Sequence, residues 1–282
     1  MQSYSATLAQ SAEIWLLPAA FLMGLLVGSF LNVVIARLPV MMEHAWQDAC
    51  ADIHGHDTPV RERFNLAWPG SHCPSCRHAL SWHELLPVLS WLWQRGRCRH
   101  CAAPVSWRYP LVELLTAALF LACAFRFGPS PAALAGMVLC ATLVALAAID
   151  ARTMLLPDSI NQPLLWAGLL LNLGPYGFAS IADATLGAAA GYGSLWLVAT
   201  VFRLVTGKEG MGQGDWKLLA ALGAWFGWQA LPGVILMASL AGVAVSLVLI
   251  VARRATRGQA IPFGPYLAAA GVATLMRTGM VS

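Results

Sequence analysis

The sequence contains very little charge. Only 11% of its 282 residues are Asp, Glu, Lys or Arg, whereas 59% are hydrophobic, and the mean hydropathy is +0.66. This composition excludes an ordinary soluble globular domain and is typical of a polytopic membrane protein. The net charge of +4 is small and is not gathered into a basic stripe, which excludes a nucleic-acid-binding protein.

The sequence also lacks three features: the basic region of a signal peptide, a nucleophile triad in the apolar runs, and a nucleotide-binding motif. Residues 1–15 contain no Lys or Arg, so the first apolar run lacks the basic region of a cleavable signal peptide and is predicted to be a retained helix. All seven His residues lie within 37–109, so no serine in the other apolar runs has a His partner of the kind that a nucleophile triad needs. No glycine-rich nucleotide fingerprint occurs either.

Apolar runs fill most of the remaining chain. Five runs reach the length of roughly 17–25 residues that a spanning helix needs, and three shorter runs can span if they are sheltered inside a bundle. The sequence therefore predicts an all-α polytopic membrane protein with about eight transmembrane helices. The predicted spans are 15–36, 110–128, 131–149, 160–173, 179–202, 218–231, 233–252 and 261–276.

The basic residues predict the orientation of these helices. With eight alternating spans, 15 of the 17 Lys and Arg residues fall on one side, and only Arg126 and Arg277 fall on the other. An excess of basic residues marks the cytoplasmic side. We expect an outward N-terminus with the first helix at 1–36, a cytoplasmic loop domain at 37–109, and a seven-helix membrane core at 110–282.

The predicted cytoplasmic loop contains two cysteine pairs, and its first part, 43–63, is predicted to be irregular. The pairs are Cys73-Pro-Ser-Cys76 and Cys98-Arg-His-Cys101, separated by 21 residues. Two such knuckles complete a tetrahedral zinc site. The alternative of two disulfides is disfavoured in a reducing compartment. We therefore predict structural Zn²⁺ bound by Cys73, Cys76, Cys98 and Cys101.

Three aspartates are predicted to lie at the cytoplasmic ends of helices. Asp158 follows a proline and is expected to cap a helix N-terminus. Asp215 follows the glycine-rich stretch 207–214, where it is either a cap or part of a site. Asp150 lies in the last turn of a helix, where the dipole disfavours a carboxylate, so it has no capping role. Two carboxylates that share a proton can act as acid and base, which makes Asp150 and Asp215 the candidate catalytic pair.

Polar and small residues in the first two helices have open roles. Gly24 and Gly28 favour close helix packing. Asn32 is interpreted as an interhelical hydrogen-bond donor or, alternatively, as part of a site. Glu113 either pairs with Arg108 or contributes to a site.

Taken together, the motifs resemble those of the bacterial type IV prepilin peptidases of pilus and type II secretion systems. The resemblance covers the chain from about residue 20 to its end. Its motifs are Gly28-Ser-Phe-Leu-Asn-Val-Val-Ile-Ala-Arg37-Leu-Pro39, the four cysteines, Ile149-Asp150 with Leu155-Leu-Pro-Asp158, and Glu209-Gly-Met-Gly-Gln-Gly-Asp215-Trp-Lys217.

This resemblance implies a function and a set of partners. It implies that Asp150 and Asp215 cleave the basic leader of prepilins or pseudopilins after a Gly, at the cytoplasmic face of the bacterial inner membrane. It also implies methylation of the new N-terminus from S-adenosylmethionine, although no motif marks the residues that bind this donor. The other partner is the lipid bilayer, and nucleic acid is not expected. The competing hypotheses are a peptidase without methyltransferase activity, a proton-coupled transporter, and a zinc-loop scaffold without chemistry.

Overall fold

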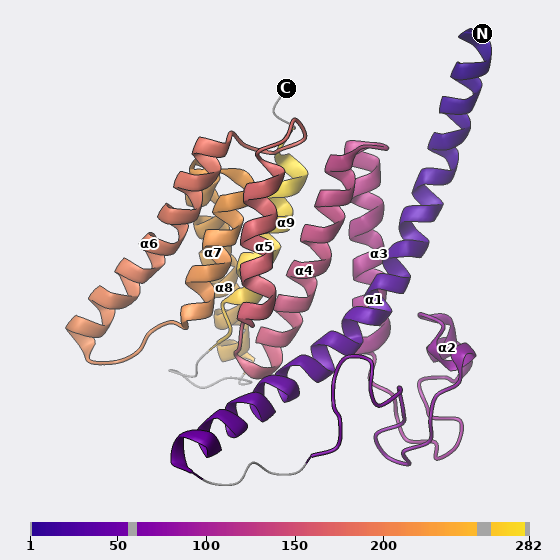
Figure 1. The fold of residues 1–282 in the computed structure, drawn as a ribbon, viewed down its shortest axis with the longest axis horizontal. Coiled ribbons are helices and arrows are strands. Elements are labelled where there is room, and N and C mark those ends of the chain that lie inside the picture. Colours follow the sequence, from indigo (N-terminus) through magenta and orange to yellow (C-terminus); the bar gives the residue numbers. More distant parts are fainter. Residues whose placement is uncertain (1, 56–60, 253–260, 280–282) are drawn as a thin grey trace. The chain divides into compact units, whose positions relative to one another are not determined.

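The computed structural model describes residues 2–55, 61–252 and 261–279, and within these ranges it contains helices and no β-strand (Figure 1). The all-α prediction is confirmed for the described chain. The chain forms two compact units, residues 1–128 and 129–282. The predicted division into a first helix (1–36), a loop domain (37–109) and a membrane core (110–282) stays a prediction.

The first unit contains two long helices joined by an irregular segment with two short helical turns. Its elements are α1 (Gln2–His54), η1 (Trp82–Leu85), α2 (Leu89–Trp93) and α3 (Arg108–Phe127). Helices α1 and α3 pack so closely that a Cβ atom at Gly24 would lie 2.5 Å from the Cα atom of Ala117. At Gly28 a Cβ atom would lie 2.7 Å from the Cα atom of Glu113. The prediction that these glycines permit close packing is confirmed.

Helix α1 is longer than the sequence indicated. The prediction of irregular structure from residue 43 is wrong for residues 43–54, which continue the helix to His54 in spite of Pro39. This segment contains three Ala residues besides Glu43 and Gln47, and these residue types favour helix. The Gln47 amide also donates to the Glu43 carboxylate one turn earlier, at 2.7 Å, as side chains four residues apart do on a helix.

The second unit is a bundle of six longer helices that run alongside one another in Figure 1. They are α4 (Pro131–Thr153), α5 (Asp158–Leu171), α6 (Ile181–Thr206), α7 (Gln213–Phe226), α8 (Leu231–Val251) and α9 (Gly264–Arg277). Helix α7 lies at the centre, where it contacts α5, α6, α8 and α9. Every residue from Leu218 to Phe226 is buried. A helix that is buried on all sides is apolar all round, and the sequence of α7 beyond its first turn fits this rule.

The C-terminal end of α7 is fixed by one buried asparagine. The Nδ2 group of Asn172 donates to the carbonyl oxygen of Ala224 at 2.8 Å and to that of Trp225 at 3.1 Å. Its Oδ1 atom accepts from the backbone N–H groups of Phe178 and Ala179. Because all four hydrogen-bonding positions of the amide are used, this contact joins α5 to α7 without leaving a buried polar atom unpaired.

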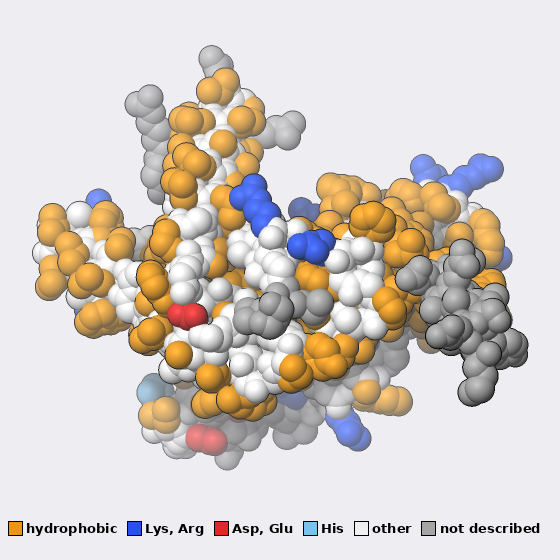
Figure 2. All heavy atoms as spheres, turned by 90° about the horizontal axis from the view of Figure 1, so that it is seen from above, with side chains coloured by type: hydrophobic (Ala, Val, Ile, Leu, Met, Phe, Trp, Pro, Cys, Tyr) orange, Lys and Arg blue, Asp and Glu red, His pale blue; other side chains and the backbone are white. Residues whose placement is uncertain are grey.

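Five helical segments are long and apolar enough to cross a membrane, and the chain is a multi-pass membrane protein. They are Trp15–His54, Arg108–Phe127, Pro131–Thr153, Ile181–Thr206 and Trp228–Val251. Figure 2 shows hydrophobic side chains over much of the visible surface, as a lipid environment permits.

The number of eight spans stays a prediction. Helices occupy all eight predicted positions, but α5, α7 and α9 have 14 residues each, or about 21 Å of helix. Arg253, Arg254 and Arg257 contribute to the charge asymmetry that motivated the count, and they lie outside the described residues.

Candidate active site and metal centre

Asp150 lies in the last turn of α4, in the second unit. The helix ends because Met154 adopts a left-handed conformation with φ of 55°, and its N–H donates to the carbonyl oxygen of Asp150 at 2.9 Å. The Asp150 side chain is 5% exposed. Its Oδ2 atom accepts a hydrogen bond of 2.9 Å from the backbone N–H of Gly264, the first residue of α9. This carboxylate is therefore held by a second helix.

Asp215 lies in the first turn of α7 and is 8% exposed. The alternative that it caps the helix is excluded, because the N-cap residue is Gly212 and no side chain makes a capping hydrogen bond. Its Oδ1 atom is buried and has no hydrogen-bond partner among the described residues. Leu156 packs both on Gly214, next to Asp215, and on Gly264, whose N–H binds Asp150, so the structure brings the two predicted residues close together as a buried pair.

The remaining acids described in this unit have structural partners or face solvent. Asp158 was predicted to cap a helix, and this prediction is wrong. Pro157 is the N-cap of α5, while the Asp158 carboxylate binds Lys217 Nζ at 2.6 and 2.8 Å. Asp183 accepts hydrogen bonds from the side chains of Ser180, Trp228 and Gln229. Asp150 and Asp215 are the only buried carboxylates in the described part of residues 129–282.

Leu156 joins α7, which carries Asp215, to α9, which binds the Asp150 carboxylate. A Cβ atom at Gly214, next to Asp215, would lie 2.6 Å from the Cβ atom of Leu156. At Gly264 a Cβ atom would lie 3.1 Å from the Cδ2 atom of the same leucine. The side chain of Leu156 thus packs on the first turns of both α7 and α9. The sequence reasoning did not assign roles to Leu156 or Gly264, although Leu156 belongs to a motif that it singled out.

The four predicted metal ligands form one cluster in the first unit. The Sγ atoms of Cys73, Cys76, Cys98 and Cys101 all lie within 4.8 Å of one another. The Sγ atoms of Cys73 and Cys101 are 3.8 Å apart, and those of Cys76 and Cys98 are 4.0 Å apart. A tetrahedral zinc ion with Zn–S distances of about 2.3 Å requires sulfur atoms about 3.8 Å apart, whereas a disulfide requires about 2.05 Å. The cluster can therefore hold a metal ion.

Two equivalent knuckles of the backbone build this cluster. Their first cysteines, Cys73 and Cys98, are 25 residues apart. In the first, the N–H of Cys73 donates to the carbonyl oxygen of His78, and Arg77 has a left-handed φ of 57°. In the second, the N–H of Cys98 donates to the carbonyl oxygen of Ala103, and Ala102 has a left-handed φ of 57°. The backbone N–H groups of Cys76 and Ser75 lower the pKa of the Cys73 thiol to about 6, which favours the thiolate form that binds metals.

Asn32 and Glu113, which had open roles, take part in contacts within the first unit. The prediction of an interhelical hydrogen bond is confirmed for Asn32, whose Nδ2 group donates to the carbonyl oxygen of Tyr109 at 3.1 Å. The Oε2 atom of Glu113 accepts a hydrogen bond of 2.7 Å from the backbone N–H of Val88. The buried Glu113 therefore binds the loop segment rather than Arg108.

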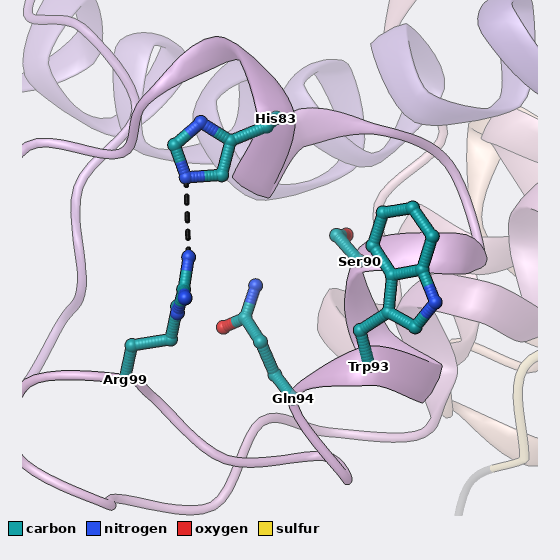
Figure 3. Close-up of a pocket in the computed structure, with 5 residues that line it drawn as sticks. All are labelled: His83, Ser90, Trp93, Gln94 and Arg99. Atoms are coloured by element: carbon teal, nitrogen blue, oxygen red, sulfur yellow. Dashed lines mark hydrogen bonds between the residues drawn. The ribbon is translucent and has the colours of Figure 1, made fainter.

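A cavity of about 310 Å³ lies beside the cysteine knuckles (Figure 3). It is lined by His83 on η1, Ser90 and Trp93 on α2, Gln94 at the end of α2, and Arg99. Arg99 lies between two metal-ligand cysteines. Its Nη1 atom is 3.2 Å from Nε2 of His83, and because a guanidinium only donates, the imidazole nitrogen accepts. The cavity therefore presents a cation and an aromatic ring to the same space.

Two family models cover most of the chain. The "Bacterial Peptidase A24 N-terminal domain" matches residues 22–127, and the "Type IV leader peptidase family" matches residues 137–247. The boundary between the two matches falls at the boundary between the two compact units. The first match contains the four cysteines, and the second contains both aspartates.

Curated relatives give the same result over almost the full length. The chain is 54% identical to the "Prepilin leader peptidase/N-methyltransferase" of Aeromonas hydrophila, with 91% of this chain and 89% of that protein covered. It is 53% identical to the protein of the same description from Burkholderia pseudomallei (strain 1026b), with coverage of 91% and 84%. It is 48% identical to that from Dickeya chrysanthemi, with coverage of 94% and 93%. The chain belongs to the type IV leader peptidase family.

Membership of the type IV leader peptidase family makes the chain a peptidase. No solved structure matches it.

Proposed function

We propose that this type IV leader peptidase cleaves the basic leader of prepilins or pseudopilins after a Gly, with Asp150 and Asp215 as its catalytic pair. We further propose that it methylates the new N-terminal residue. The observation that carries the proposal is the pair of buried carboxylates from α4 and α7, in a unit whose other described acids are bound elsewhere or exposed. The names of the relatives support both activities.

The paired carboxylates account for hydrolysis. One carboxylate removes a proton from a water molecule, and the resulting hydroxide attacks the carbonyl carbon of the scissile peptide bond. The other carboxyl group donates its proton to the carbonyl oxygen, and the C–N bond then breaks as the departing nitrogen takes up a proton. The products are a leader that ends in a carboxylate and a mature chain with a free amine. Two acids that share one proton can perform both transfers.

The methyl donor implied by the name of the relatives is S-adenosylmethionine. When bound, it supplies an electrophilic methyl group to the new amine. The residues around the cavity fit this ligand: the Arg99 guanidinium pairs with a carboxylate, and the Trp93 ring stacks on an adenine or covers a cation. Gln94 and Ser90 add hydrogen-bonding groups. The volume of about 310 Å³ lies at the lower end of the range for small-molecule sites.

We propose that the metal of the cysteine cluster is a structural zinc ion. Four thiolates fill a tetrahedral coordination sphere, and no position is left for water or substrate. The metal would hold Arg99 in place, because this residue lies between two of the ligands, Cys98 and Cys101.

The proposed location is the bacterial inner membrane, with the active site at the cytoplasmic face. The distribution of Lys and Arg supports this orientation. The substrate also supports it, because a prepilin carries a basic head on an apolar helix. Its scissile bond would then lie at the membrane boundary. Asp150, in the last turn of α4, and Asp215, in the first turn of α7, would lie at the same boundary.

The proposal is tested with detergent-solubilised protein, a leader-bearing prepilin, and S-adenosylmethionine that carries a labelled methyl group. We expect release of the leader and transfer of the label to the new N-terminus, measured by mass spectrometry. Failure to release the leader would refute the peptidase. Cleavage without label would show a peptidase that lacks methyltransferase activity.

The two activities should be separable at Trp93. The lining of the cavity belongs to the first unit, and the aspartates belong to the second. Loss of one stacking contact costs about 1–3 kcal/mol, so Trp93→Ala should raise the KM for S-adenosylmethionine by about five- to 150-fold. The rate of leader cleavage should stay within about twofold of the wild type, because that step uses the aspartates.

Trp46→Ala provides the matched control for this prediction. Trp46 is an exposed tryptophan on α1 that does not line the cavity. Both activities should remain unchanged in that variant. An unchanged KM for the methyl donor in Trp93→Ala would place the donor site elsewhere.

A further inference from the structure

Asp150 and Asp215 differ in how they are held. Oδ2 of Asp150 accepts a 2.9 Å hydrogen bond from the backbone N–H of Gly264. Oδ1 of Asp215 has no partner among the described residues. A pair of carboxylates that acts on one water molecule needs a fixed geometry, because a displacement of about 1 Å can reduce a rate about a hundredfold. The backbone of α9 supplies that constraint for one member of the pair.

Residue 264 also has to be free of a side chain. A Cβ atom built at Gly264 would lie 2.7 Å from Oδ2 and 3.1 Å from Cγ of Asp150. The first distance is shorter than real Cβ contacts and the second is tighter than most of them, so the carboxylate would have to move. The same Cβ atom would lie 3.1 Å from Leu156, which already packs on Gly214 beside the other aspartate. The space around Asp150 therefore permits only glycine without displacement.

We propose that Gly264 is a positioning residue for peptide cleavage: its backbone N–H fixes the Asp150 carboxylate, and its missing side chain leaves room for that carboxylate beside Asp215. This inference rests on the proposed function of the two aspartates. It assigns the N-terminus of α9 to the site, although the residue lies 114 positions from Asp150 in the sequence.

The first test is the kinetics of Gly264→Ala. The displaced carboxylate should reduce kcat for leader cleavage by about a hundredfold, while KM stays within about twofold, because substrate contacts elsewhere are kept. Methyl transfer to a substrate that has already been cleaved should continue. Gly233→Ala is the matched control, since a Cβ atom at that position on α8 would meet nothing within 4 Å.

The second test is a thermodynamic cycle that remains informative even if Gly264→Ala folds poorly. The melting temperature is measured for Gly264→Ala, Asp150→Ala and the double variant. If the added methyl group clashes with the Asp150 carboxylate, removal of that carboxylate should relieve the clash. Introduced into the wild-type protein, Gly264→Ala should then lower the melting temperature. Introduced into the Asp150→Ala protein, it should leave the melting temperature nearly unchanged.

Two results would overturn the inference. One is a kcat within about twofold of the wild type in a folded Gly264→Ala protein, and the other is the same loss of melting temperature in both backgrounds. The proposed function fails separately, if Asp150→Asn or Asp215→Asn still cleaves. With those variants inactive and Gly264→Ala fully active, only the role of Gly264 would be refuted.

Discussion

Asp150→Asn and Asp215→Asn should each remove nearly all leader cleavage. Asparagine keeps the volume and most of the shape of aspartate, but it does not exchange the proton. General acid and general base act as a unit, so the loss from either substitution should approach the loss from both. A fall of at least about a thousandfold in kcat is expected for each single variant, measured as leader release at matched amounts of folded protein.

The control for this prediction is Asp158→Asn. Asp158 lies in the same unit, at the first residue of α5. Its carboxylate binds Lys217 and is about half exposed. An exposed ion pair contributes about 0–1 kcal/mol, so this variant should cleave at close to the wild-type rate. Full activity in Asp150→Asn, or an inactive Asp158→Asn protein, would show that the wrong carboxylates have been paired.

The positions of the two aspartates at helix ends were predictable because each residue broke a rule of helix chemistry or of membrane insertion. Asp150 lies at a helix C-terminus, where a carboxylate is disfavoured. Asp215 lies between a polar glycine-rich stretch and an apolar run. Position along the chain was enough to place both at helix ends. The four cysteines were equally readable, because a closed tetrahedral site requires two short, matched spacings.

The contact that holds the Asp150 carboxylate was not predictable in the same way. The donor to Asp150 is a backbone N–H, which has no sequence signature, and it comes from the far end of the chain. Glycine at position 264 is explained by the close approach of the Asp150 carboxylate and of the Leu156 side chain. The role of Asp158 was predicted wrongly. Its position after a proline suggested a helix cap, but its carboxylate instead forms a long-range ion pair with Lys217.

The continuation of α1 to His54 shows a third kind of limit. The hydrophobic run ends near residue 36 and a proline follows, so the sequence pattern indicated a helix boundary. The helix nevertheless continues past Pro39 to His54. The pattern of apolar residues predicts where a helix meets lipid, but a helix can extend past that boundary.

The second large effect is expected from the cysteine cluster. Purified protein should contain about one zinc ion per chain, and Cys98→Ser should abolish its binding, as measured by elemental analysis. Zinc contributes about 10–16 kcal/mol to the folding of small zinc modules. Residues 61–107 contain only two short helical turns and two isolated bridges, so little other structure stabilises them. Limited proteolysis should therefore cut this segment much faster in the variant.

The cysteine cluster would also connect the metal to the proposed methyl-donor site. Arg99 and its partner His83 line the cavity, and Arg99 lies between Cys98 and Cys101. Loss of zinc in Cys98→Ser should therefore reduce methyl transfer more strongly than leader cleavage, because both of the proposed catalytic aspartates belong to the other unit. Cys50→Ser, outside the cluster, should keep the zinc, the resistance to protease and both activities. Wild-type protein with no metal, and with the four thiols recovered as two disulfides, would refute the zinc site and its proposed effect on the cavity.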